Sequence, residues 1–328
     1  MKKTIFLGIL GIALFTSFNN GHSVHAQENS NNNQQEILAA TVTVSTYEEL
    51  RNALSNDNGV TTVILANDIT LERGIKIHPA KKELTINGQS HTLTEATNGS
   101  HGTIYVENNN GTKTINLNNL SILGKNYYGP VNIDDNVYGV TLNYSNITYS
   151  GPQLVHNIHG YATFSGTTKA EIKQVMTNSD TPQEFAEALG ITIKGSFNLD
   201  HQSISDSAFW FGLGNDHIPY FSIEDNADVF INVANNTLFY VDNSSTKPLD
   251  ISVGQSGKFN VTTIRELFRL GNAGNLIFQN NSKTQINRST NTTNAPTLKV
   301  SGTIKVNKGA IFDINHAPET TANKIVGS

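Results

Sequence analysis

The chain has 328 residues, of which 37% are hydrophobic and 15% are charged, and its formal net charge is −5. The charged share is well below the roughly 25% of an average soluble domain, and a mildly acidic chain lacks the basic surface of a nucleic-acid-binding protein. No cysteine is present, which excludes disulfide bonds and thiolate chemistry. A low charge with abundant Asn, Thr and Gly is typical of an extracellular β-protein.

Residues 1–26 have the pattern of a secretory signal peptide. Lys2 and Lys3 precede an apolar run over 4–18, and the Val-His-Ala sequence at 24–26 places small residues at both cleavage-specifying positions. The apolar run is shorter than the about 20 residues of a membrane span. We therefore expect cleavage near Ala26, a mature chain without a transmembrane segment, and a net charge of −7 once both lysines are lost. The polar, Asn-rich and Gln-rich residues 27–40 predict a disordered leader.

A strand at 41–44 and a short helix are predicted to open the folded domain. Ser45 and Glu48 match a capping box, in which Ser45 would be the N-cap. The apolar face of this helix would consist of Tyr47, Leu50, Ala53 and Leu54. We expect the helix to cover the end of a repetitive β-structure, which would otherwise expose unpaired backbone groups. Strands are predicted to resume at 62–65 and 69–71.

The rest of the chain repeats itself at an interval of about 29 residues, within the range of solenoids. Aromatic segments recur at 209–211, 238–240 and 267–269, and a second and a third family of strand-like segments run in phase with them. Short Asn, Gly and Ser turns, such as Asn226-Ala227 and Asn281-Ser282, separate the second family from the third. The repeat extends upstream, where we align Ile86, Leu117 and Leu142 as equivalent positions.

Three short strands joined by such corners describe one coil of a right-handed parallel β-helix. Each strand alternates apolar and polar residues, so one face points inward and the other to solvent. Asn and Gly suit the corners because they tolerate the left-handed backbone region. The predicted fold is therefore all-β, a parallel β-helix over 41–315 with three-strand coils, an N-terminal capping helix and a C-terminal tail at 316–328.

One helical excursion is predicted to interrupt the coils. Thr181 would be its N-cap, Pro182 its first residue and Glu184 the reciprocating residue. Phe185, Ala188 and Leu189 would form its apolar side, and Gly190 would end it.

Three stretches in this order resemble the pectate-lyase-like adhesive domain of Gram-positive surface proteins: 44–50 (VSTYEEL), 63–69 (VILANDI) and 84–88 (LTING). Residues 185–195 are similar to that family's central insertion. The resemblance covers roughly Val42 to Ile314. It implies a right-handed β-helix exported to the cell surface with a role in attachment.

The signatures of catalysis on this scaffold are missing. Polysaccharide lyases use acidic Ca²⁺ ligands and an Arg or Lys base, but neither a Trp-Ile-Asp-His run nor an Arg-x-Pro-x-x-Arg run occurs. The candidate acids are Asp134, Asp135, Glu224, Asp225 and Asp228, and the candidate bases are Arg265 and Arg269. Inverting hydrolases use paired carboxylates, whereas Asp134 and Asp135, adjacent in sequence, would point to opposite faces of a strand. We expect no metal site and no cofactor, because no metal-ligand spacing is present.

The best candidate for a binding site is a loop outside the repeat. It carries Tyr127, Tyr128 and Tyr138 beside Asp134 and Asp135, and aromatic rings with carboxylates could hold a glycan. A well-packed turn is the alternative. Trp210, the only tryptophan, aligns with Phe239 and Phe268 one and two coils on, which favours an aromatic ladder over a sugar-stacking role.

These patterns predict a secreted or cell-surface β-solenoid that acts as a non-catalytic adhesive module. Its expected partners are host or biofilm glycans or matrix proteins, with no nucleic acid, and we expect a monomer. The alternatives are a polysaccharide lyase or hydrolase with an unrecognised site, and a passive stalk that displays another part of a longer protein.

Overall fold

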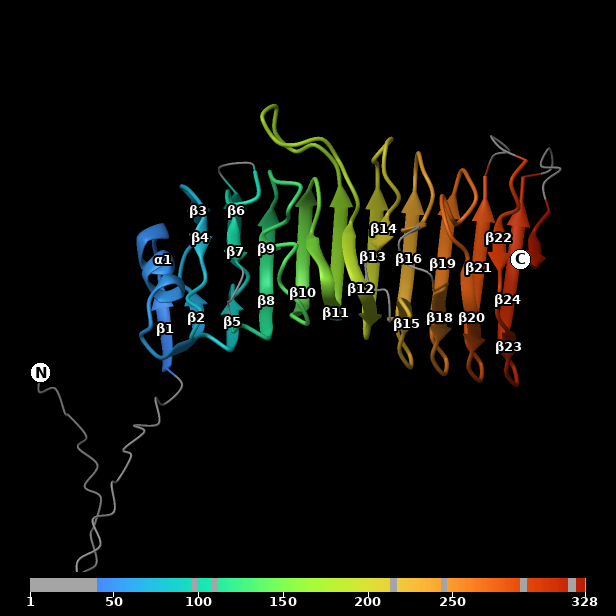
Figure 1. The fold of residues 1–328 in the computed structure, drawn as a ribbon, viewed down its shortest axis with the longest axis horizontal. Coiled ribbons are helices and arrows are strands. Elements are labelled where there is room, and N and C mark those ends of the chain that lie inside the picture. The colour runs from blue at the N-terminus through green and yellow to red at the C-terminus, as the bar shows by residue number, and fades with distance from the viewer. Residues whose placement is uncertain are drawn as a thin grey trace, which may run out of the picture. The chain divides into compact units, whose positions relative to one another are not determined.

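The computed structural model describes residues 40–95, 99–107, 111–212, 217–242, 247–289, 294–317 and 323–327. The predicted signal peptide and nearly all of the predicted leader lie outside these residues. Within them the chain forms a parallel β-solenoid of about eight turns, and its coils follow one another along one axis from β1 to β24 (Figure 1). Every strand pairing is parallel and connects one coil to the next, for example Val229 with Phe259.

The strands stack into three faces. The first face contains β4 (Ile75–Lys76), β7 (Ile104–Val106), β9 (Val131–Ile133), β14 (Phe209–Phe211), β17 (Phe239–Val241), β22 (Leu298–Val300) and β25 (Ile325–Gly327). The second face contains β1 (Ala40–Val44), β2 (Val60–Leu65), β5 (Glu83–Asn87), β15 (Tyr220–Ile223), β18 (Leu249–Val253), β20 (Ala273–Phe278) and β23 (Ile304–Val306). The third face contains β3 (Ile69–Leu71), β6 (Thr92–Glu95), β13 (Ser196–His201), β16 (Asp228–Val233), β19 (Lys258–Thr263), β21 (Lys283–Arg288) and β24 (Ile311–His316). Four strands turn a corner: β8 (Thr114–Leu123), β10 (Thr141–Gly151), β11 (Val155–Ile172) and β12 (Ala186–Ile193).

The corners between the second and third faces confirm the predicted role of Asn. Asn119, Asn146, Asn226 and Asn281 have φ angles of 52° to 59°, in the left-handed region that Asn tolerates better than most residues. At the β5–β6 corner Gln89 and Ser90 take the left-handed region instead, and at the β18–β19 corner Ser256 does.

The core is a continuous column of apolar side chains inside the coils. Phe239 is 0% exposed, and its ring centroid lies 5.2 Å from that of Phe268, 5.4 Å from that of Phe221 and 6.0 Å from that of Phe209. Such offset and tilted ring pairs add to the stabilisation from burial. Each coil therefore supports its neighbours through the same column.

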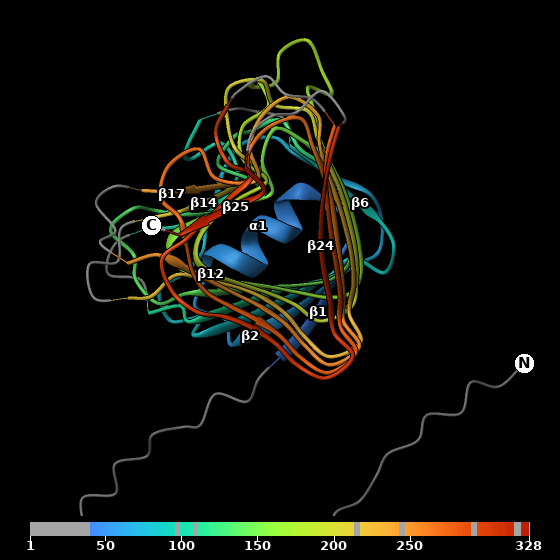
Figure 2. The same ribbon diagram turned by 90° about the vertical axis from the view of Figure 1, so that its right-hand side faces the viewer.

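The helix α1 (Tyr47–Ser55) lies across the N-terminal end of the solenoid, as predicted (Figure 2). Tyr47, Leu50, Ala53 and Leu54 are its buried residues. The expected cap is displaced by one residue, because Thr46 is the N-cap and its side chain accepts a hydrogen bond from the Glu49 amide. Glu49 in turn accepts a hydrogen bond from the Ser45 amide at 2.6 Å.

The predicted second helix is wrong. Residues 186–193 form β12, which pairs with β11 on one side and with β14 and β15 on the other. Phe185, Ala186, Ala188 and Ile191 are all 0% exposed. The capping signal at 181–184 is local. Stacking between two coils satisfies the backbone hydrogen bonds of these residues and buries their apolar side chains on the core side. These tertiary interactions outweigh the local helix preference.

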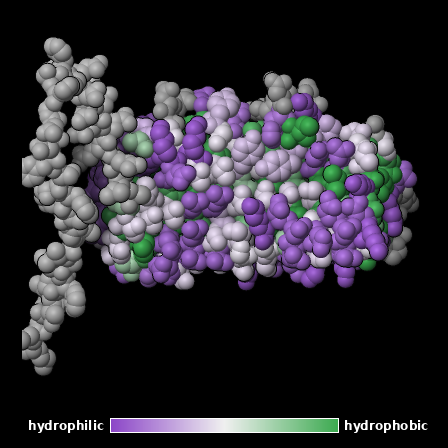
Figure 3. Space-filling view, turned by 90° about the horizontal axis from the view of Figure 1, so that it is seen from below, coloured by the Kyte–Doolittle hydropathy of each residue, from purple (hydrophilic) through white to green (hydrophobic). Residues whose placement is uncertain are grey.

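One predicted alignment and the predicted C-terminal tail differ from the structure. Ile86 pairs with Leu117, but Leu117 pairs with Tyr144 rather than with Leu142. The predicted C-terminal tail contains the end of β24 and all of β25, which pairs with β22. The last coil exposes several apolar side chains, and hydrophobic residues gather toward this end of the molecule in Figure 3; they include Ile304, Val306, Ile311 and Ile325.

Candidate functional site

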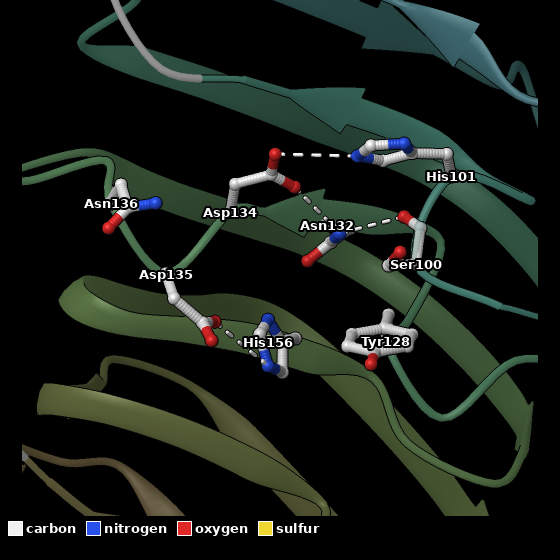
Figure 4. A pocket seen from close by; sticks show the side chains of 8 residues that line it. All are labelled: Ser100, His101, Tyr128, Asn132, Asp134, Asp135, Asn136 and His156. Carbon is white, nitrogen blue, oxygen red and sulfur yellow. Dashed lines mark hydrogen bonds and ion pairs between the residues drawn. The ribbon is translucent and has the colours of Figure 1, made fainter.

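A pocket of about 320 Å³ opens on the outer side of the first face, where β7, β9 and the start of β11 follow one another (Figure 4). Asn132 and His156 occupy the outward central positions of their strands and pair with each other across neighbouring coils. Tyr105 precedes them in the same row. The complete lining is Ser100, His101, Tyr128, Asn132, Asp134, Asp135, Asn136 and His156.

The loop before β9 brings the predicted tyrosines to the pocket rim. The Tyr128 amide donates to Asn126 Oδ1 at 2.7 Å, and the Tyr127 amide donates to Asp180 Oδ2 at 3.0 Å. Gly129 has a φ of +73° and approaches the Leu154 carbonyl so closely that a Cβ would lie 2.6 Å from its oxygen. This close approach turns the chain and sets the Tyr128 ring 4.9 Å from the His156 ring.

The two tyrosine hydroxyls are hydrogen-bonded to each other at 2.7 Å, and the ring centroids are 4.1 Å apart. The hydrogen bond with Tyr127 raises the pKa of Tyr128 to about 12. Tyr128 therefore presents a neutral aromatic ring to a ligand.

Asp134 and Asp135 do not point to opposite faces of a strand, as the sequence suggested. They follow the last residue of β9 in a turn, closed by a 2.8 Å hydrogen bond from the Val137 amide to the Asp134 carbonyl. Both therefore line the pocket. Asp134 is held by His101 Nε2 at 3.4 Å and by Asn132 Nδ2 at 3.2 Å, whereas the Asp135 side chain is 69% exposed.

His156 lies between two carboxyl groups. Its Nε2 is 3.2 Å from Glu187 Oε2 and 3.8 Å from Asp135 Oδ1. Burial lowers the pKa of His156, and burial raises the pKa of the Glu187 carboxyl well above its usual value. Both shifts favour a neutral imidazole beside a protonated Glu187. The acidic side chains that line the pocket itself are Asp134 and Asp135.

The row continues beyond the pocket along the first face. Glu187 pairs with Trp210, and Trp210 pairs with Tyr240. The indole and phenol rings stack at 6.5 Å, and Arg269 lies 5.9 Å from the Tyr240 ring centre. The aromatic ladder is confirmed in kind but its register was wrong by one residue, because Phe209, and not Trp210, aligns with Phe239 and Phe268.

The other candidate acids and bases have structural partners. Asp225 accepts a hydrogen bond from the Gln255 amide at 2.7 Å, and Asp228 forms an ion pair with Lys258 at 2.8 Å. Arg265 contacts Glu266 at 3.2 Å, and Arg269 donates to the Ser205 carbonyl at 2.8 Å. Glu224 lies on the second face, where it lines a separate hollow.

Of the five predicted binding residues, Tyr128, Asp134 and Asp135 line the pocket and Tyr127 contacts Tyr128. Tyr138 does not line it; its ring stacks on His159 at 4.3 Å and its side chain is exposed. The sequence reading missed Ser100, His101, Asn132, Asn136 and His156. The available signal was a polar residue flanked by apolar ones, as in Val131-Asn132-Ile133.

Among the described residues, no group of three or more His, Cys, Asp or Glu side chains has an arrangement that could hold a metal ion. Within the same part of the chain, no helix has the length and apolar character needed to span a membrane.

The comparisons with known proteins concern the family and the fold. Residues 41–156 match the family "Putative pectate lyase-like adhesive domain", which confirms the resemblance over about a third of the chain, up to His156 in the pocket. The predicted central insertion at 185–195 lies outside the match.

Two solved structures are similar to the chain. "L. reuters 100-23 SRRP" has a TM-score of 0.64 and 19% identity over 88% of this chain and 99% of that one. "L. reuteri 53608 SRRP" has a TM-score of 0.47 and 18% identity over 87% and 99%. The first likeness shows a shared fold. No curated protein sequence matches the chain.

Proposed function

We propose that this protein is a non-catalytic adhesive module of the cell surface that binds glycans through the first-face pocket. The observation that carries the proposal is the convergence of the half-buried Tyr128 ring, which packs against Tyr127, with hydrogen-bonding groups in one hollow of the β-solenoid. Aromatic surfaces with a few fixed polar groups are typical of ligand sites. The adhesive description of the matched family supports the same role.

The partners that we propose are glycans of a host surface or a biofilm, with matrix proteins as a second class. A glycan array with the purified protein identifies the ligand. Tyr128→Ala should abolish binding, because it removes a ring that lines the pocket. Tyr138→Ala is the matched control, since Tyr138 is an exposed tyrosine outside the pocket and its loss should leave binding intact. Equal effects of the two substitutions would show that the pocket is not the site.

Export of the chain belongs to the same proposal. Residues 1–26 would direct secretion, and the mature protein at the cell surface should begin at Gln27. N-terminal sequencing of the secreted protein tests this, and an intact Met1 would refute it.

Polysaccharide hydrolysis is the second candidate function. The observation that favours it is Glu187, a carboxyl with a raised pKa close to His156, on the face that also carries the exposed Asp135. Inverting hydrolases combine a protonated acid with a carboxylate that activates water. Reducing ends released from a bound oligosaccharide, and lost in Glu187→Gln, would place hydrolysis first; we expect none.

A further inference from the structure

The first-face pocket contains a buried hydrogen-bond acceptor without a donor. Asn132 is 1% exposed, and its Nδ2 donates to the Ser100 carbonyl at 2.7 Å and to Asp134 Oδ1 at 3.2 Å. Its Oδ1 is buried and accepts no hydrogen bond from the described residues. A buried acceptor without a donor is costly unless a ligand or water supplies one. This orphaned oxygen indicates that a donor belongs in the pocket.

Asp135 adds a second acceptor with free capacity. Its carboxylate is largely exposed, and its approach to His156 Nε2 at 3.8 Å is too long for a hydrogen bond. In Figure 4, Asp135, Asn132 and His156 surround the middle of the pocket, with the Tyr128 ring at one side. A donor placed there would meet the amide oxygen, a carboxylate and an aromatic ring.

The charges at the pocket favour a cation. Asp134 and Asp135 line the pocket, while burial lowers the pKa of His156 and raises the pKa of Glu187, which disfavours the charged form of both. Lys76, which does not line the pocket, has an electrostatic interaction with Asp134, and its ammonium is paired with Glu107. His101 contacts Asp134 through Nε2. An anionic saccharide would meet like charge here, whereas an ammonium group would be attracted both to the carboxylates and to the tyrosine ring.

We propose that the pocket recognises a glycan that carries free amino groups, such as an oligomer of unacetylated 2-amino sugars. The ammonium group lies between Asp135 and Asn132 Oδ1, and the sugar ring lies against Tyr128 and Tyr127. The volume of about 320 Å³ is at the low end of small-ligand pockets, which suits a short saccharide better than a polypeptide segment. This inference rests on the proposed glycan-binding function and adds the ligand's chemical class.

The test is calorimetric titration of the purified full-length protein with three tetrasaccharides at pH 6.5: tetraglucosamine, its fully N-acetylated form and tetragalacturonate. We expect tetraglucosamine to bind at least tenfold more tightly than the other two, and more weakly as salt is added. Asp135→Asn should lower its affinity at least tenfold. Asp313→Asn, which removes the same charge from an exposed site on the last coil, should not change it.

The outcomes separate the two proposals. Preferential binding of the acetylated or the uronate tetramer would overturn the amino-sugar inference and leave glycan binding standing. Absence of binding to all three tetramers, together with a negative glycan array, would overturn both. Tighter binding of tetralysine than of tetraglucosamine, with the same loss in Asp135→Asn, would overturn the glycan in favour of a basic peptide.

Discussion

A Glu95→Gln variant should gain stability over the wild-type protein as the pH rises from 4.5 to 8. Glu95 is 1% exposed at the end of β6, and burial raises its pKa from 4.5 to about 7. The hydrogen bonds that Glu95 accepts from the Lys125 and Asn126 amides act in the opposite direction, but burial outweighs them. Thr103 Oγ1 donates to the Pro130 carbonyl at 2.6 Å and lies 3.2 Å from Glu95 Oε1, to which it can also donate.

The magnitude follows from the shift. An acid whose pKa is higher in the folded than in the unfolded state binds more protons when folded, so stability falls as the pH rises between the two values. A rise in the pKa from 4.5 to about 7 corresponds to about 3 kcal/mol of folding free energy. The wild-type protein loses this stability progressively as the pH rises through that interval, and it loses none of it below pH 4.5. Glutamine should keep the local bonds: its oxygen can accept from the Lys125 and Asn126 amides, and its amide can donate to Thr103 Oγ1.

Urea unfolding of both proteins at several pH values measures the effect. Glu184 and Glu187 also have raised pKa values, but they are present in both proteins and cancel in the difference. The two proteins should be similar near pH 4.5, and the variant should be more stable by about 3 kcal/mol at pH 8. Glu83→Gln, at an exposed position of β5, should show no comparable trend. Parallel curves for wild type and Glu95→Gln would refute a protonated Glu95.

Three further predictions concern stability and binding. Phe239→Asp should unfold the domain, because it removes the central ring of the phenylalanine column and buries an unpaired charge, whereas Asn226→Asp at a corner should cost less than about 1 kcal/mol. Thermal melts followed by circular dichroism compare the two variants, and equal costs would contradict the assigned register. Arg288→Ala should lower the free energy of unfolding by about 3 kcal/mol or more, because the buried guanidinium donates to the Ala295 carbonyl and lies 3.9 Å from Glu266. A loss below about 1 kcal/mol in urea unfolding would show that these contacts are dispensable. Trp210→Ala should leave tetraglucosamine affinity unchanged within twofold, since Trp210 stacks on Tyr240 outside the pocket; a tenfold loss by calorimetry would extend the site along the first face.

The repeat and its corners could be predicted because their cause is local. A left-handed corner favours Asn or Gly whatever its surroundings, and Asn226 and Asn281 were predicted on that basis. The helix α1 was found for a similar reason, since its cap and its apolar stripe lie within ten residues. The false helix at 181–190 had the same local signals. Residues 186–193 form a strand because they pair with strands of neighbouring coils, which are 23 to 31 residues away in sequence and which no local pattern contains.

The candidate site was only half predictable for the same physical reason. Tyr128, Asp134 and Asp135 are close in sequence, and their combination of rings and carboxylates could be recognised directly. Asn132 and His156 are brought together by a register between coils. A register must be known to within one residue, because a one-residue slip turns a side chain from the outside to the core. The Trp210 alignment, wrong by one, shows how easily this happens for adjacent aromatic residues.

The geometry of a coil explains why a pocket forms on the first face. The second and third faces meet at short corners, and β8 and β10 run through the corner without a break. Strands of the first face are mostly only two or three residues long and are flanked on both sides by longer connections, such as the 125–130 and 134–139 loops. These connections vary from coil to coil without disturbing the core, because only the central strand residues have to align. Ligand-binding residues can therefore change there at little cost in stability, which is the property that an adhesive module requires.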